Sequence, residues 1–184
     1  YRTTSRETMP MTLGPKTLLI ASPELDDPQF KQSVVLILEH DEEETVGLII
    51  NRDSRINCTQ IMKQFNLEWY GPHENLLVGG PVDPKSLWMI HGEGWPFDHK
   101  TIFHGLSVSR SEEALSVLCH AREQRLNVYV GYAGWGAGQL EREIQEGSWW
   151  TVEVDADFIF ETDRSDMWSE ALARLGVDSE MLLL

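Results

Sequence analysis

The sequence predicts an α+β fold, a strongly bent mixed β-sheet or partial barrel with peripheral helices. Two observations support this class. Apolar runs joined by polar turns, typical of β-hairpins, dominate the first half of the chain, whereas strands alternate with helices in the second half. The 184 residues, 41% of them hydrophobic, suffice for the core of one domain. We expect a single domain over residues 16–184 and a flexible, polar arm over residues 1–15.

The strands are predicted from short runs rich in Val, Ile and Leu that end at turn residues. The second and third runs flank an acidic loop at residues 41–44, a pattern that favours a hairpin. Between the fourth and fifth runs, residues 81–84 contain two prolines and predict a rigid turn. The predicted strands are residues 17–21, 33–40, 46–51, 75–82, 86–91, 101–108, 127–132 and 148–154.

The helices are predicted from apolar spacing and from capping residues. Asn57 caps a helix over residues 57–65, and Ser109 with Glu112 matches a capping box before a second helix. That second helix carries Cys119 on its apolar stripe. The remaining predicted helices are residues 138–146, 155–161 and 166–175, the first and last of which stop at Gly147 and Gly176.

Charge and cysteine content restrict the class of partner and the compartment. The 30 acidic and 15 basic residues give a formal charge of −15, which repels polyanions and anionic membranes, so we expect no direct nucleic-acid or membrane contact. Cys58 and Cys119 are too few for a disulfide scaffold. No apolar run reaches the roughly 20 residues of a membrane helix. These features predict a cytoplasmic location, although the sequence begins at Tyr1 and leaves open what precedes it.

A glycine-rich segment at residues 131–144 is the strongest site candidate. It is predicted to run from a strand through a turn into a helix, and two interpretations stay open. The backbone N–H groups cradle a ligand at the helix start, or the glycines permit a tight crossing packed by aromatic side chains. The spacing is neither a dinucleotide fingerprint nor a P-loop. The candidate residues are Gly131, Tyr132, Gly134, Trp135, Gly136, Gly138 and Gln139.

Four further side chains join the candidate site. Strand alternation places Trp149 on the face opposite Val152, where it either caps the glycine turn or meets a partner. Asn51 and Arg52 end a buried strand and can orient a carboxylate or phosphate, although such an arginine also pairs internally, here with Glu39. His40 completes the set.

The sequence predicts neither a metal nor a cofactor, and its motifs argue against an enzyme. The histidines at positions 40, 91, 99 and 104 lack the spacing of a zinc or iron site. The common nucleophile, zinc-protease and kinase motifs do not occur. Cys119 on an apolar stripe is typical of an inert core thiol.

The glycine-rich segment and several shorter motifs are similar to the bacterial AlgH/YqgE proteins. The resemblance covers about residues 16–176, with two departures, Asp41 and Asp53, in place of the usual Asn and Pro. It implies an α+β fold with bent, partly barrel-like sheets and a label as transcriptional regulators, and it offers no established catalytic residues to carry over to this sequence. The shorter motifs lie at residues 18–23, 27–30, 33–35, 39–40, 47–52, 79–82 and at Trp149.

These observations favour a non-enzymatic, cytoplasmic regulatory protein that acts through protein contacts around residues 131–139 and Trp149. The alternative is an enzyme or small-ligand-binding protein whose pocket lies at the glycine-rich turn, with Asn51, Arg52 and His40. The third hypothesis is direct DNA binding. It is the least favoured because the C-terminal segment 155–174 is rich in Asp and Glu.

Overall fold

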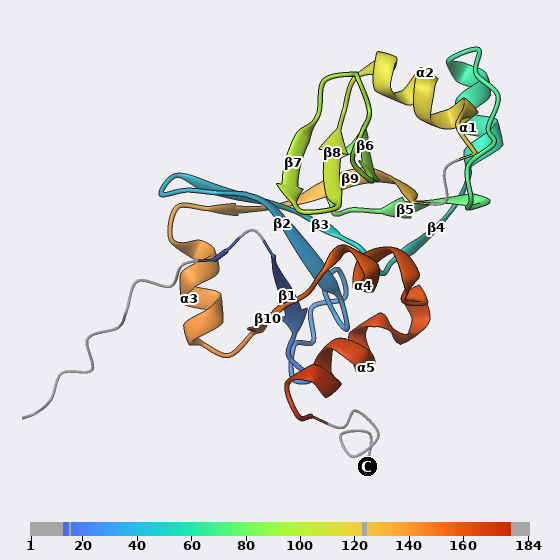
Figure 1. Ribbon diagram of the computed structural model, residues 1–184. Coiled ribbons are helices and arrows are strands. Elements are labelled where there is room, and N and C mark those ends of the chain that lie inside the picture. Colours follow the sequence, from blue (N-terminus) through green and yellow to red (C-terminus); the bar gives the residue numbers. More distant parts are fainter. Residues whose placement is uncertain (1–12, 15, 123–124, 178–184) are drawn as a thin grey trace, which may run out of the picture.

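The computed structural model describes residues 13–14, 16–122 and 125–177. Within these residues the chain forms ten strands and five helices, so the predicted α+β class is confirmed (Figure 1). The predicted arm at residues 1–15 lies outside the described residues except for positions 13 and 14.

The elements follow the predicted order along most of the chain. The strands are β1 (Thr17–Ala21), β2 (Val34–His40), β3 (Glu44–Ile49), β4 (Asp53–Asn57), β5 (Asn75–Val78), β6 (Val82–His91), β7 (Lys100–Phe103), β8 (Leu106–Ser109), β9 (Leu126–Gly136) and β10 (Trp149–Glu153). The helices are α1 (Cys58–Gln64), α2 (Glu112–His120), α3 (Gln139–Gln145), α4 (Ala156–Glu161) and α5 (Arg164–Arg174).

The strands form one bent sheet in the order β10-β1-β2-β3-β9-β6-β8-β7, with neighbours antiparallel. Strand β5 adds a parallel pair with β9 and an antiparallel pair with β4. The long strand β9 joins the two halves of the sheet, because its beginning pairs with β6 and its end pairs with β3. Figure 1 shows α1 and α2 at one end of the molecule and α4 and α5 at the other.

Buried side chains form three clusters on different faces of this sheet. The first contains Leu36 and Leu172 and lies between β1–β3 and the helices α4 and α5. The second contains Val128 and Leu118 and lies under α1 and α2. The third contains Val35 and lies on the opposite face of β2, under α3. Successive strand residues therefore supply different clusters, as the pleat of a strand requires.

Four sequence predictions of local structure fail. The rigid turn expected at residues 81–84 is mostly strand, because β6 begins at Val82. The single strand expected at residues 101–108 is the β7–β8 hairpin, because Gly105 turns the chain at a φ of 83°. Strand β4 is absent from the prediction because its residues are polar and half-exposed, without alternation. The predicted capping box is wrong as well, since Ser111 caps α2 by accepting from the backbone N–H of Ala114 and Ser109 ends β8.

Candidate functional site

The glycine-rich segment is a strand for most of its length. Strand β9 continues to Gly136, and residues 133–136 pair with residues 44–47 of β3, so the predicted turn after residue 132 is wrong. Only Gly138, at a φ of 68°, turns the chain into α3. The strand persists because its side chains alternate, with Ala133 and Trp135 buried and Gly134 and Gly136 exposed.

Gly131 lies where two backbone segments touch. Its φ is 71°, and a Cβ atom there would lie 2.3 Å from the carbonyl oxygen of Gly80. Gly80 in turn contacts the backbone of Tyr132, where a Cβ would lie 2.2 Å from the carbonyl carbon. Gly131 of the glycine-rich segment and Gly80 of the loop after β5 therefore allow the two backbones to cross in close contact, which supports the interpretation as a tight crossing.

Trp135 and Trp149 are packed inside the molecule. They are 4% and 2% exposed, their ring centroids lie 6.0 Å apart, and Phe30 contacts both. Both indole N–H groups donate to Oε1 of Glu143 on α3, at 3.2 and 3.1 Å. The structure therefore places Trp149 as a cap on the glycine-rich segment, and neither indole is available to a partner.

His40 and Gln139 stabilise the end of this segment. His40 Nε2 lies 3.1 Å from Oε1 of Glu141, and its Nδ1 lies 2.6 Å from Oγ1 of Thr45, so it links the β2–β3 hairpin to α3. Gln139 Oε1 accepts from the backbone N–H of Gly136 at 3.0 Å. The Gln139 side chain thus already accepts from the backbone N–H of Gly136, one of the donors that would have to bind a ligand if this segment were a ligand cradle.

Asn51 and Arg52 lie away from the glycine-rich segment and hold the loop before β2. Asn51 accepts from the backbone N–H of Val34 and donates to the carbonyl of Gln32, each at 2.9 Å. Arg52 donates to the carbonyls of two loop residues, Gln29 and Lys31. Its predicted pairing with Glu39 is wrong, because that carboxylate pairs with Lys100 at 3.3 Å.

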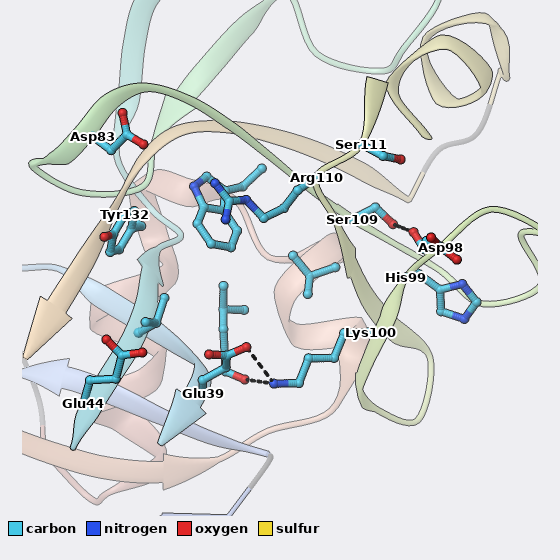
Figure 2. Close-up of a pocket in the computed structure, with 14 residues that line it drawn as sticks. Glu39, Glu44, Asp83, Asp98, His99, Lys100, Ser109, Arg110, Ser111 and Tyr132 are labelled. Atoms are coloured by element: carbon cyan, nitrogen blue, oxygen red, sulfur yellow. Dashed lines mark hydrogen bonds and ion pairs between the residues drawn. The ribbon is translucent and has the colours of Figure 1, made fainter. Parts of the chain in front are cut away.

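A cavity of about 580 Å³ lies on the face of β9 that carries Tyr132 (Figure 2). Strands β2 and β3 form one wall, β6, β7 and β8 form the other, and Leu38, Val46 and Val108 supply its apolar part. Of the predicted site residues, Tyr132 alone lines it, half-buried, with its ring 5.5 Å from that of Trp88. Concave sites with an apolar floor and a few polar groups are where proteins bind small molecules.

Arg110 is the most distinctive side chain of this cavity. Its guanidinium lies 3.8 Å above the ring of Trp88, a cation–π contact. Within the described residues Arg110 has no ion pair or side-chain hydrogen bond, whereas Lys100 donates to Glu39 and to the carbonyl of Leu38. Figure 2 shows Arg110 in the middle of the cavity, with the carboxylates of Asp83 and Glu44 on one side. No local motif points to this pair, because only strand pairing between β6 and β8 brings Trp88 beside Arg110.

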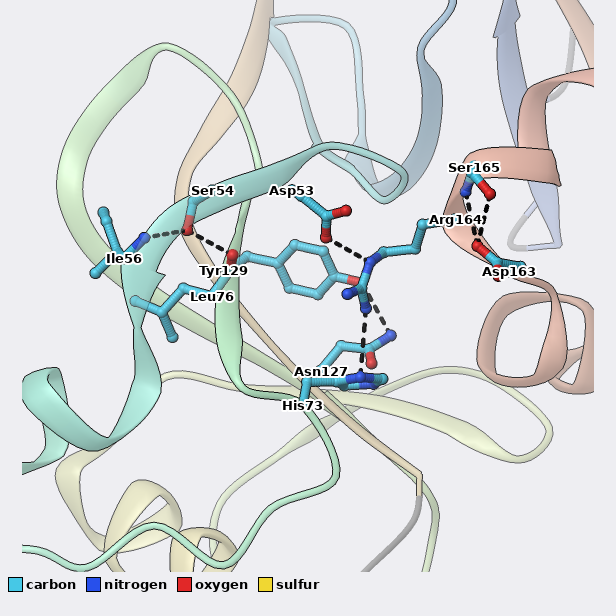
Figure 3. A network of polar contacts seen from close by, with 10 residues as sticks. All are labelled: Asp53, Ser54, Ile56, His73, Leu76, Asn127, Tyr129, Asp163, Arg164 and Ser165. Atoms are coloured by element: carbon cyan, nitrogen blue, oxygen red, sulfur yellow. Dashed lines mark hydrogen bonds and ion pairs between the residues drawn. The ribbon is translucent and has the colours of Figure 1, made fainter.

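A second polar group of residues lies between β9 and the start of α5 (Figure 3). Arg164 donates from Nε to Asp53 at 2.8 Å and from a terminal nitrogen to Nδ1 of His73 at 3.4 Å. Asn127 donates to the hydroxyl of Tyr129 at 3.2 Å, and both side chains are buried. Burial raises the pKa of Tyr129 well above its ordinary value. Burial and the neighbouring Arg164 lower the pKa of His73, so this imidazole is neutral at pH 7.

The neutral histidines predict a pH dependence of stability. Burial lowers the pKa of His91 as it does that of His73. At a pH between the folded-state and unfolded-state pKa values, each of these two imidazoles therefore binds fewer protons in the folded state. Their contribution to stability is present above the unfolded pKa of about 6.5 and is lost as the pH falls. We expect the free energy of unfolding, measured with urea, to decrease between about pH 7 and pH 5.

Replacing one histidine tests the origin of this dependence. The His73→Gln variant should lose part of the decrease, whereas His104→Gln, at an exposed histidine, should retain all of it. An unchanged slope in the His73→Gln variant would contradict the assignment.

Both cysteines lie in the core, the position that the sequence predicts for Cys119. Both thiols are buried, and burial raises the pKa of Cys58 to about 12 and also raises that of Cys119. In the described ranges, no group of three or more His, Cys, Asp or Glu side chains is arranged to hold a metal ion. In the same ranges, no helix has the length and hydrophobicity needed to cross a bilayer.

Comparisons with known proteins place the chain in a family. The profile of a family described as AlgH-like, DUF179, matches residues 18–180. A UPF0301 protein of Photobacterium profundum is 38% identical over 169 residues, which cover 87% of this chain and 90% of the relative. A UPF0301 protein of Myxococcus xanthus is 36% identical, covering 91% and 93% of the two chains.

Solved structures agree with this relationship. The solution structure of the AlgH protein from Pseudomonas aeruginosa is similar with a TM-score of 0.75 and 31% identity, over 95% of this chain and 96% of that one. A crystal structure of a Corynebacterium diphtheriae protein, 22% identical, has a TM-score of 0.70 over 88% and 86% of the two chains and supports the fold alone. The chain belongs to the AlgH-like family.

Proposed function

We propose that this chain is a non-enzymatic regulatory protein that binds a small dipolar molecule in the cavity beside Tyr132. A dipolar molecule here carries one anionic and one cationic group. The observation that carries this proposal is the guanidinium of Arg110, stacked on Trp88 and without a charged partner among the described residues. Stacking holds the guanidinium plane in place, so its N–H donors are oriented for a carboxylate or phosphate before the ligand arrives.

The opposite charge on the ligand is inferred from the other side of the cavity. Asp83 and Glu44 line it there, and neither carboxylate has an ion pair within the described part of the chain. Glu39 is already paired with Lys100. A ligand with only negative charge would be opposed by these carboxylates, whereas a dipolar ligand satisfies both sides.

Binding is favoured over catalysis by the state of a nucleophile–base pair formed by Ser109, which lines the cavity, and His91 behind it. Ser109 Oγ lies 2.7 Å from Nε2 of His91, a distance suited to proton transfer. The two side chains are 3% and 1% exposed, however, and Figure 2 shows the hydroxyl of Ser109 turned toward Asp98 and away from Arg110. The pair therefore supports a structural role rather than attack on a bound molecule.

The regulatory part of the proposal rests on the family resemblance and on charge. Protein contacts remain the predicted output, because a net charge of −15 opposes direct contact with DNA. With Trp135 and Trp149 buried, the aromatic surface expected to make those contacts is not exposed. The ligand-binding alternative is therefore the one that the geometry supports best.

Calorimetric titration with free amino acids and dipeptides tests the proposal. We expect at least one dipolar compound to bind saturably, and the Arg110→Gln variant to weaken it about tenfold or more, because a charge-assisted contact contributes about 1.5–3 kcal/mol. Succinate, which carries only negative charge, and putrescine, which carries only positive charge, serve as matched probes.

The control variant is Arg122→Gln, which makes the same change at an exposed arginine outside the cavity lining. It should bind as the unmodified protein does. No saturable binding of any dipolar compound, or equal affinity in the Arg110→Gln and Arg122→Gln variants, would contradict the proposal.

A further inference from the structure

Three cationic side chains line one cavity of this acidic protein. Lys31, Arg52 and Arg164 contribute to a cavity of about 320 Å³, and Asp53 is the one acidic residue among those that line it. The chain as a whole has twice as many acidic as basic residues. We propose that this cavity is a second binding site, separate from that of Arg110, and that it takes a phosphate group.

Arg52 presents a fixed guanidinium to the cavity. Two of its N–H donors hold the carbonyls of Gln29 and Lys31, and Asn51 holds the next residue of the same loop, Gln32. These contacts use two of the five N–H donors of the Arg52 guanidinium and fix its orientation. The remaining donors of the guanidinium have no partner within the described residues, and a planar fork of this kind matches a phosphate.

Lys31 adds a cation that no protein group uses. Its side chain is exposed, and it makes no ion pair or side-chain hydrogen bond in the described part of the chain. Its backbone carbonyl accepts from Arg52 at 3.1 Å, so the root of the side chain is fixed beside that guanidinium. A lysine ammonium group binds phosphate as a point charge and needs no fixed orientation.

Arg164 closes the cavity at the first residue of α5. Its Nε donates to Asp53, which offsets one of the three positive charges and leaves two. Asp163, the cap of this 11-residue helix, accepts from Ser165 and lines the neighbouring cavity instead of this one. Asp163 and Asp166, in the first turn, offset the positive end of the helix dipole, so the local positive potential comes from the cationic side chains that line the cavity.

The net charge of the protein does not cancel this local field. At physiological ionic strength the screening length is about 8 Å, so charges on distant surfaces contribute little inside the cavity. The side chains that line the cavity dominate the potential there. An oxyanion with two negative charges, as phosphate carries near neutral pH, matches the two unbalanced cations.

A titration followed by two-dimensional amide NMR tests the site, with inorganic phosphate added to the full chain at constant ionic strength. The reporters are the Lys31 amide and the indole N–H of Trp168, which lines the cavity and donates to the carbonyl of Ala21. We expect saturable shifts at both. The Lys31→Ala variant should bind about fivefold or more weakly, because one direct charge-assisted contact is lost.

Lys63→Ala is the matched control, since it removes one cation from α1, outside the cavity, and should bind normally. The Arg110→Gln variant should also keep its phosphate affinity, which separates this site from the proposed function. A parallel titration with glycerol 3-phosphate distinguishes two sources of the phosphate group. Tighter binding of glycerol 3-phosphate indicates a phosphorylated small molecule, whereas equal or tighter binding of inorganic phosphate indicates free phosphate. No saturable shift with either compound, or equal affinity in the Lys31→Ala and Lys63→Ala variants, would overturn the inference.

Discussion

The Gly131→Ala variant is expected to lose about 3 kcal/mol or more of its free energy of unfolding. The new Cβ would lie 2.3 Å from the carbonyl oxygen of Gly80, and the residue would keep a φ of 71°, which side-chain-bearing residues rarely adopt. The clash is with backbone, so no rotation of a side chain relieves it. Urea unfolding followed by circular dichroism measures the loss.

Gly138→Ala is the matched control in the same segment. Gly138 has a similar φ of 68°, but the atom nearest to the added methyl group, on the side chain of Arg142, lies 3.7 Å away. We expect a loss of about 1 kcal/mol, from backbone strain alone. Equal losses in the two variants would show that the crossing at Gly131 does not need a glycine.

The Trp149→Ala variant should lose about 3–5 kcal/mol, the usual cost of removing a fully buried tryptophan. Its ring packs against Trp135 and Phe30, and its indole N–H donates to Glu143. The cavity left behind would expose the third core cluster, under α3, to water. The same urea measurement applies, with the slope of the transition checked for two-state behaviour.

Trp150→Ala provides the comparison, because the neighbouring ring on β10 is only half-buried and points to the other face of the strand. We expect it to cost clearly less than Trp149→Ala. If Trp149 were instead a contact surface for a partner, its removal would leave stability nearly unchanged, contrary to its packing against Trp135 and Phe30.

The fold is predictable where one residue pattern decides one element. The apolar runs of β1 and β2 and the Asn57 cap of α1 are such cases, and the structure confirms all three. Strand β4 is not predictable, because it is polar and exists through pairing with β5. The glycine-rich segment departs from its prediction for a related reason. Its local propensity favours a turn, but pairing with β3 keeps it a strand.

The candidate site is less predictable than the fold. Strand alternation places Trp149 on the correct face, but the sequence does not tell whether that face is covered, and Phe30 and Glu143 cover it. The cavity side chains Trp88 and Arg110 come from separate parts of the chain that only the pairing of β6 with β8 brings together, and no local motif links them. The anion-binding role of Arg52 stays a prediction, and the structure shows that this arginine lines a cavity.

The glycine-rich segment shapes the fold, whereas we propose that ligand binding belongs to the cavity of Trp88 and Arg110. The most direct test of where a ligand binds is a two-dimensional NMR titration with the dipeptide that binds best in calorimetry. We predict shifts of the Trp88 indole N–H and of the Arg110 and Tyr132 amides. Shifts confined to the amides of Gly136 and Gln139 and to the indole N–H groups under α3 would contradict it.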